Sequence, residues 1–295
     1  MATTAENETT IAALRAGGEI GGVYACSRKE RLTTRAGAPY LAIELRDRSG
    51  SLEGRVFRDA DFLAGRFERG DLVQVRGRVE RFRDSLQAEL TDIRRVSPGD
   101  ADPADFLPRA YRDLDELDGF FDHLAGEVYD AELRRLVDAF AVDSSFRAEL
   151  RGAPCTRGGH HAYLGGLLEH TVAVATLAVE ACTLHPRLNS DVLVAAALLH
   201  DIGKTREFAY GADISLSDEG RLLGHLAIGQ RMIAERAADA RVPEAKTLAL
   251  LHCVLAHHGA DALPGRRFGS AEALALHRLN ALDASVKGAL EHGLG

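Results

Sequence analysis

The spacing of apolar residues changes once along this chain, and that change constrains the fold more than any other feature. Over residues 20–96 apolar and polar residues alternate, as Val73 and Val75 do with Gln74 and Arg76, which is typical of half-buried strands. From residue 113 onward apolar residues recur every three or four positions, as in amphipathic helices. Residues 97–103 are rich in Pro, Gly and Asp and mark a linker. We therefore predict a β domain followed by a helical domain.

Five strands are predicted within about eighty residues, a size at which a closed or nearly closed barrel removes exposed sheet edges. An OB-fold is the leading candidate. The 295 residues are enough for two independent cores. We expect a multidomain α+β protein. The predicted parts are a mobile tail with one helical turn at 1–18, the barrel at 19–97, a linker at 98–112 and an all-helical domain at 113–295. The helices are expected near 113–141, 160–184, 189–203, 222–238, 244–258 and 271–291.

Charge is unevenly distributed between these two parts. Residues 19–97 hold 16 Lys and Arg against 13 Asp and Glu, a balance of +3, whereas the remainder holds 20 against 31, a balance of −11. The total of −8 argues against a protein that coats nucleic acid, since such proteins carry an excess of basic residues. The pattern indicates a mildly basic module joined to an acidic one.

Three features indicate a cytoplasmic protein with no membrane association. The longest apolar runs, such as Val192 to Leu199, are far shorter than the roughly 20 residues of a membrane span, and the N-terminus has no signal-peptide pattern. The four cysteines are widely spaced and form no CxxC pair, which favours free thiols in a reducing compartment.

All 12 histidines lie in the predicted helical half. His200 and Asp201 end the apolar run Val192 to Leu199, so an imidazole and a carboxylate lie side by side at the end of a buried helix. A buried carboxylate is costly without a cation or a hydrogen-bond donor. A single histidine on such a helix is more often a hydrogen-bonded core residue than a ligand. The other histidines of the chain are therefore needed to decide between these two roles.

A set of further histidines lies on separate predicted helices. His170 follows the sequence GGLLE, His225 follows a glycine, and His257 and His258 precede one. Helical bundles build metal sites by converging such side chains on one interior point. The pattern therefore predicts a metal site between the helices.

These motifs resemble those of HD-superfamily metal phosphohydrolases. The stretches HHAYLGGLLEHT at 160–171 and LHDIGK at 199–204 are similar in particular to the YhaM-type 3′-to-5′ exoribonucleases, which join an N-terminal OB-fold to a C-terminal HD domain. The resemblance covers the chain from about residue 19 onward. It implies a metal-dependent hydrolase that removes nucleotides from the 3′ end of single-stranded RNA. Mixed imidazole and carboxylate ligation suits manganese or iron; the resemblance favours manganese, as one or two ions, with magnesium also possible.

The resemblance also implies roles for individual residues. Asp201 and Lys204 are the expected catalytic residues, with Lys204 facing the substrate phosphate. Its alternative role is that of an ordinary lysine at a helix C-terminus, where the helix dipole favours a cation. The expected metal ligands are His170, His200, Asp201, His225, His257, His258 and the residue at position 280.

Position 280 departs from the family pattern, because Asn280 aligns with a liganding aspartate. An amide oxygen binds a hard cation more weakly than a carboxylate does. Asp283 lies one helical turn later and either substitutes for it or has a structural role. Glu169 is either an outer partner of a liganding histidine or part of a solvated face. No cysteine is expected near the motif, which argues against a structural zinc ion.

The barrel is expected to bind single-stranded RNA or DNA through cationic side chains and exposed aromatic rings. Aromatic residues of a small barrel more often fill its interior, and exposed arginines often form weak ion pairs instead. Two other functions stay open: an HD phosphohydrolase of small nucleotides whose barrel serves homo-oligomerisation, and a nucleic-acid-binding protein weakened in catalysis by Asn280. The candidate nucleic-acid-binding residues are Lys29, Arg31, Arg35, Tyr40, Arg55, Phe57, Arg76, Arg78, Phe82 and Arg83.

Overall fold

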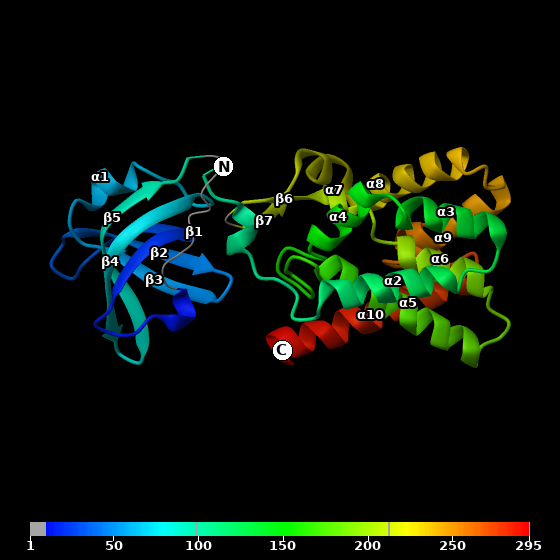
Figure 1. Cartoon of the computed structure of the whole chain (residues 1–295), viewed down its shortest axis with the longest axis horizontal. Coiled ribbons are helices and arrows are strands. Elements are labelled where there is room, and N and C mark those ends of the chain that lie inside the picture. The colour runs from blue at the N-terminus through cyan, green and yellow to red at the C-terminus, as the bar shows by residue number, and fades with distance from the viewer. Residues whose placement is uncertain (1–9, 98–99, 212, 295) are drawn as a thin grey trace. The chain divides into compact units, whose positions relative to one another are not determined.

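The computed structural model describes residues 10–97, 100–211 and 213–294 (Figure 1). The chain forms two compact units. The first consists of Met1–Pro108 with Tyr210–Ser215, and the second of Arg109–Ala209 with Leu216–Gly295. Each unit has its own hydrophobic core. The predicted order, a barrel followed by a helical domain, is confirmed.

The first unit contains a closed five-stranded barrel with the strand order β1-β2-β3-β5-β4. Strands β3 and β5 pair in parallel, whereas the other neighbours are antiparallel. The alternating pattern places Val73, Val75 and Val79 in the buried core, as expected for a small barrel filled by side chains. The elements are β1 (Glu19–Thr33), β2 (Pro39–Asp47), β3 (Gly50–Val56), α1 (Ala60–Ala64), β4 (Leu72–Phe82) and β5 (Ser85–Arg95).

One glycine allows β4 and β5 to approach each other closely. The pairing of β4 with β5 shifts register between Arg76 and Gly77. A Cβ atom at Gly77 would lie 2.3 Å from the backbone oxygen of Glu89, far inside van der Waals contact. Glycine at a bulge of this kind is required by the approach of the neighbouring backbone.

The predicted mobile tail and linker are partly wrong. Residues 1–9 of that tail lie outside the described residues, but Ile11 and Leu14 are buried in the barrel core. The backbone N–H of Ile11 donates to Oδ2 of Asp47 at 2.8 Å, which anchors the 3₁₀ turn Ile11–Ala13. In the predicted linker, a second 3₁₀ turn, Pro103–Phe106, brings Phe106 into contact with apolar residues of β1. Apolar side chains in these segments gain burial on the barrel.

The second unit is a bundle of helices around one core. Every residue of α6 from Val192 to Leu199 is buried, because neighbouring helices surround it on all sides (Figure 1). The predicted helix at 113–141 is two helices, since Asp130 begins a new one as its N-cap. The helices are α2 (Leu114–Gly126), α3 (Ala131–Ala141), α4 (Ser144–Gly152), α5 (Gly166–Leu184), α6 (Ser190–Leu199), α7 (Lys204–Glu207), α8 (Asp218–Asp239), α9 (Glu244–Ala256) and α10 (Ala271–His292).

The C-terminal part of the chain is not entirely helical, contrary to the prediction. Strands β6 (Phe208–Tyr210) and β7 (Ile214–Leu216) form a small sheet. Residues 210–215 belong to the barrel unit, within which Asp213 forms an ion pair with Arg46 at 2.6 Å. The predicted domain boundary therefore does not hold for this segment, which is too short for a periodic apolar signal.

Helix α5 is long and apolar enough to cross a membrane by length and composition alone. Half of that stretch is buried inside the protein, and the buried side chains include the polar residues Glu169 and His170. These are features of a core helix, because a polar side chain facing lipid would be costly.

Candidate metal and catalytic site

Asp201 lies at the centre of the helical unit, directly after α6. Helix α6 ends at Leu199, His200 is its C-cap, and the Asp201 side chain is 1% exposed. Gly203 brings α8 close to this point, since a Cβ atom there would lie 2.1 Å from the backbone oxygen of His225. Helix α8 breaks at Gly224, whose φ is 69°. The two glycines thus place His225 beside Asp201.

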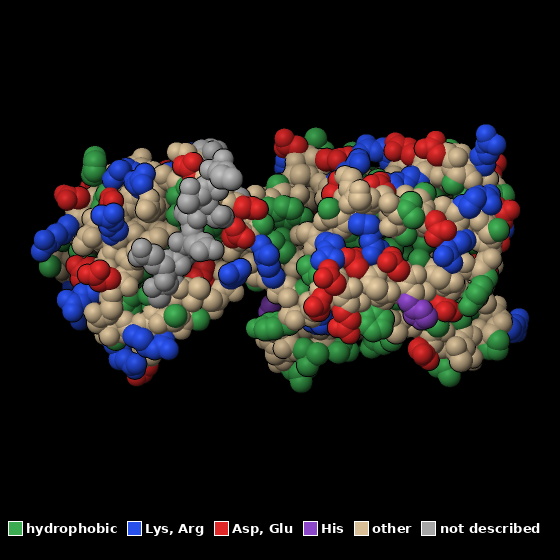
Figure 2. All heavy atoms as spheres, in the orientation of Figure 1, with side chains coloured by type: hydrophobic (Ala, Val, Ile, Leu, Met, Phe, Trp, Pro, Cys, Tyr) green, Lys and Arg blue, Asp and Glu red, His purple; other side chains and the backbone are tan. Residues whose placement is uncertain are grey.

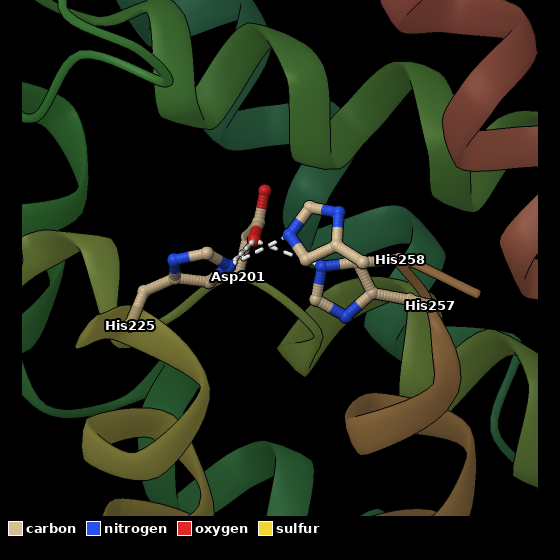
Figure 3. Close-up of side chains that lie close together, drawn as sticks. All are labelled: Asp201, His225, His257 and His258. Carbon is tan, nitrogen blue, oxygen red and sulfur yellow. Dashed lines mark hydrogen bonds and ion pairs between the residues drawn. The ribbon is translucent and has the colours of Figure 1, made fainter. Parts of the chain in front are cut away.

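One oxygen of Asp201 faces the histidines of α8 and of the end of α9 (Figure 3). Oδ1 of Asp201 lies 3.4 Å from Nε2 of His257 and 3.6 Å from Nε2 of His225. His258 belongs to the same group, in which the candidate ligand atoms all lie within 4.8 Å of one another. This group joins three histidines to one carboxylate.

The other oxygen of Asp201 faces a second pair of histidines. Oδ2 lies 3.4 Å from Nε2 of His200 and 3.6 Å from Nε2 of His170. The two Nε2 atoms are 3.2 Å apart. Asp201 therefore belongs to both groups and has the position of a bridging carboxylate.

Four of these histidines have the second ring nitrogen held by a fixed acceptor. Each Nδ1–H then points away from the site and leaves the Nε2 atom facing inward. For His170 and His200 this arrangement directs two lone pairs at each other, which is repulsive without a cation between them. The four acceptors are Asp283 Oδ2 for His170 at 2.6 Å, Ala197 O for His200 at 2.8 Å, Glu207 Oε1 for His225 at 3.1 Å and Val254 O for His257 at 2.6 Å.

Buried polar atoms without hydrogen-bond partners also indicate a metal site. Among the described residues, Oδ1 of Asp201 and Nε2 of His257 are buried and have no hydrogen-bond partner. Such atoms are rare in folded proteins because leaving them unpaired costs about 1–3 kcal/mol each. A divalent cation would satisfy both, so these residues fit a metal ion.

The charge balance of the site depends on Lys204. Burial opposes ionisation of Asp201, but Lys204 together with His200 and His257 holds the pKa of this carboxyl well below its usual range. Nζ of Lys204 donates to Oδ2 of Asp201 at 2.6 Å, and the lysine is 6% exposed. Because Lys204 is buried and paired with Asp201, it is not an ordinary surface lysine at a helix C-terminus.

Burial also favours the neutral form of three of these histidines. It lowers the pKa of His170 from its usual 6.5 to about 4, although Asp283 opposes that shift, and it lowers the pKa of His257 and His258 as well. Neutral imidazole is the form that binds metal. These three residues therefore present deprotonated nitrogens at neutral pH.

The residue that holds His170 in place is Asp283. Its Oδ2 atom accepts hydrogen bonds from Nδ1 of His170 at 2.6 Å and from Nε2 of His161 at 3.0 Å. Asn280, the position of the expected ligand, is buried on α10, and its amide donates to the backbone oxygen of His257 at 3.5 Å. Asp283 thus has the orienting role, and Asn280 lies beside a histidine of the site.

His161, to which no sequence pattern assigned a role, is 1% exposed. Its Nδ1 atom lies 3.0 Å from the hydroxyl of Tyr163, and that hydroxyl donates to Glu169 at 2.7 Å. Lys287 of α10 donates to the other oxygen of Glu169 at 2.9 Å. Glu169 is therefore buried in an outer network and does not lie on a solvated face. The adjacent histidines in HHAY were the available signal.

The prediction that no thiol lies near the site is wrong. Cys155 is fully buried, and its Sγ atom lies 3.9 Å from Oδ2 of Asp201 and 3.5 Å from Nζ of Lys204. Residues distant in sequence meet at this point, so sequence spacing gave no indication of it. Burial raises the pKa of the Cys155 thiol to about 12, although Lys204 opposes the shift.

On the barrel, three exposed or half-exposed rings and two arginines form what we call the aromatic patch: Tyr40, Phe57, Phe82, Arg55 and Arg83. The rings of Tyr40 and Phe57 are 5.5 Å apart. The Arg55 guanidinium lies 5.5 Å from the Tyr40 ring and 5.7 Å from the Phe82 ring. Phe57 and Phe82 are 43% and 50% exposed, so their faces are available for stacking.

Two other barrel residues that were predicted to bind nucleic acid form contacts within the barrel unit. Lys29 does not face solvent, as its ammonium donates to the backbone oxygens of Ala64 and Phe67 and to Glu68; it secures α1 to the barrel. Arg31 forms an exposed ion pair with Asp61 at 2.8 Å.

Three predicted arginines remain exposed or line a hollow. Arg76 and Arg78 line a hollow beside Glu19, and Arg35 is exposed between β1 and β2. Figure 2 shows that basic side chains on the barrel have acidic ones among them. The geometry therefore favours the aromatic patch as the candidate interface.

Comparison with known proteins agrees with both units. Residues 167–285 match the family model of the HD domain, and residues 25–96 match that of the OB-fold nucleic acid binding domain. The 3′-5′ exoribonuclease YhaM of Oceanobacillus iheyensis is 30% identical over 277 residues, which are 92% of this chain and 85% of that protein. The protein of the same name from Bacillus subtilis is 30% identical over 257 residues, covering 85% and 80%.

A nucleic-acid-binding barrel joined to an HD domain with an inward-facing histidine and aspartate cluster defines a hydrolase of the nuclease class. The chain belongs to the YhaM family of 3′-5′ exoribonucleases.

Proposed function

We propose that the protein is a divalent-metal-dependent exonuclease that releases nucleotides from the 3′ end of single-stranded RNA. The observation that carries this proposal is the position of Asp201 between two sets of inward-facing imidazoles, with buried ligand atoms that have no hydrogen-bond partner among the described residues. Direction and RNA preference rest on the names of the relatives.

The contacts define tasks in this reaction for Asp201, Lys204, Asp283 and Glu207. A bound divalent cation supplies Lewis-acid polarisation of the phosphodiester and a nucleophile at neutral pH. Asp201 and the inward Nε2 atoms would hold it. Lys204, a buried ammonium 2.6 Å from Asp201, offers positive charge to the phosphoryl oxygens. Asp283 and Glu207 fix the orientation of His170 and His225.

The two groups differ in what they offer a cation. Asp201, His225, His257 and His258 provide one carboxylate and three imidazoles. The group of His170, His200 and Asp201 is smaller, and the fourth ligand expected there is the neutral Asn280. We propose that the larger group binds its cation more tightly, because it offers more ligands. Manganese is the proposed cation, with iron or magnesium as alternatives, because the ligand set mixes imidazole and carboxylate.

The aromatic patch supports a single-stranded substrate. Bases can stack on Phe57, Phe82 and Tyr40 only when they are unpaired, and Arg55 and Arg83 supply charge for the backbone. Action in the cytoplasm and assembly into a homo-oligomer stay predictions.

A labelled single-stranded RNA tests the proposal. With manganese, a 5′-labelled oligonucleotide should shorten stepwise from its 3′ end and release mononucleotides, whereas Asp201→Asn should leave it intact. The matching DNA strand measures sugar preference. Hydrolysis of free nucleotides without shortening of the oligonucleotide would contradict the proposal, as would cleavage that survives full chelation.

A further inference from the structure

Cys155 lies in the wall of the site but has no task in the proposed hydrolysis. It precedes α5, is 0% exposed, and its backbone N–H donates to the backbone oxygen of His161 at 3.0 Å. Its Sγ atom lies 3.6 Å from Nε2 of His160. His160 is likewise unused in the proposed reaction.

Cys155, His160 and His170 form a group whose candidate ligand atoms all lie within 4.8 Å of one another. In tetrahedral zinc sites the Zn–S bond is about 2.3 Å and the Zn–N bond about 2.0–2.1 Å, which places sulfur and nitrogen about 3.6 Å apart. The distance from Sγ of Cys155 to Nε2 of His160 is 3.6 Å. The pair therefore matches one edge of a zinc tetrahedron.

The softness of the ligands favours a different ion from that of the nuclease site. Thiolate and imidazole select zinc and similar soft cations, whereas carboxylate oxygen suits manganese and magnesium. Lys204 donates to Sγ at 3.5 Å, so a positive charge lies beside the sulfur atom. Asp201 and Asp283 supply negative charge nearby and offset the repulsion between Lys204 and a cation.

His170 connects this group to the nuclease site. Its Nδ1 atom is held by Asp283 at 2.6 Å, so only Nε2 remains for a metal ion. The same Nε2 atom faces His200 and Asp201. One nitrogen lone pair cannot serve two ions, and occupation of the two positions is therefore mutually exclusive.

We propose that Cys155, His160 and His170 form an inhibitory site for zinc, which competes for His170 with the hard cation of the nuclease site. On binding, the sulfur–hydrogen bond of Cys155 is replaced by a sulfur–zinc bond, and the proton leaves to solvent. The binding step stands on the geometry of these three residues alone. The inhibition additionally rests on the proposed nuclease function.

Titration of the full-length protein with cobalt(II), used as a probe of the zinc position, tests the site without reference to activity. The wild type should show a thiolate-to-cobalt charge-transfer band in the near ultraviolet. Cys155→Ala and Cys155→Ser should lose the band, His160→Gln should weaken it, and Cys182→Ala, a control on α5, should retain it. A band that survives both Cys155 variants, or no band in the wild type, would overturn the proposal.

The competition between zinc and manganese for His170 is tested by measuring how zinc inhibits RNA hydrolysis in the presence of manganese. Loss of even an outer partner of a metal ligand costs about 10–100-fold in affinity, so Cys155→Ala should raise the half-inhibiting zinc concentration by at least about tenfold, with inhibition measured relative to each protein's own zinc-free rate. Equal inhibition of both proteins would reject the competition for His170. Absence of manganese-dependent hydrolysis in the wild type would instead reject the proposed function, and the cobalt band would still decide the zinc site.

Discussion

Nε2 of His257 and Oδ1 of Asp201 lie 3.4 Å apart, and among the described residues neither atom has a hydrogen-bond partner. The distance is too long for a hydrogen bond of ordinary strength, but it suits two ligands of one cation. Nδ1 of His257 is held by the backbone oxygen of Val254 at 2.6 Å, so the imidazole is fixed in this orientation. The protein thus pre-forms a ligand pair.

Lys204→Met should reduce turnover while metal binding persists. The ammonium lies beside Asp201 and would stabilise charge on the phosphoryl oxygens, a contribution that typically amounts to about 10²–10³ in kcat. Steady-state hydrolysis of an oligonucleotide, compared with manganese affinity of the same variant, checks this. Lys246→Met is the control, because Lys246 pairs with Asp130 and Glu132 on α3 and its cap. Unchanged kcat in Lys204→Met would remove the lysine from the mechanism.

Asp283→Asn should weaken metal binding although Asp283 is an outer residue. Its carboxylate accepts from both His170 and His161, and loss of such an orienting partner costs about 10–100-fold in metal affinity or activity. Isothermal titration with manganese measures the effect. Asp191→Asn, which removes a carboxylate that caps the backbone near Tyr129, controls for a general loss of packing. Equal affinities in all three proteins would contradict the orienting role.

Asn280→Asp should strengthen the smaller metal group. Position 280 is the expected fourth ligand of that group, and Asn280 is buried on α10, where a carboxylate would add a charged oxygen ligand. We expect higher manganese occupancy and a higher rate of hydrolysis, measured on the same preparation. If neither the occupancy nor the rate rises, the neutral amide of Asn280 does not limit metal binding by this group.

Phe82→Ala and Arg55→Ala should raise KM for single strands and leave kcat unchanged, because the aromatic patch binds the substrate and does not react with it. Arg55→Ala should also lose one phosphate contact. The slope of log affinity against log salt concentration should then become shallower by about 0.7. Phe62→Ala is the control, since Phe62 is 70% exposed on α1 and lies outside the patch. An equal effect of all three variants would exclude a specific interface.

Periodicity was sufficient to predict the barrel, most of the helices and the burial of α6, because apolar spacing reports directly which faces are covered. The break at Asp130 and the short helix α4 were not predicted. The HD motif and its glycines likewise indicated which histidines would meet Asp201. The roles of Asp283 and Cys155 depend on distances between segments far apart in the chain, which no local pattern contains. For His161 the adjacent histidines in HHAY were a local signal, but they did not indicate its contact with Asp283. The burial of the turn Ile11–Ala13 on the barrel was missed for a related reason, since a short apolar segment gains its stability only from the barrel it covers.

We have proposed that Asp201 lies between two groups of histidines and, together with them, holds a divalent cation. Manganese content after equilibrium dialysis, compared between the wild type and Asp201→Asn, tests it most directly, because the amide keeps the shape of the side chain but not its charge. The account predicts stoichiometric manganese in the wild type and a large loss in the variant. Equal manganese in the two proteins, or none in the wild type, would contradict it.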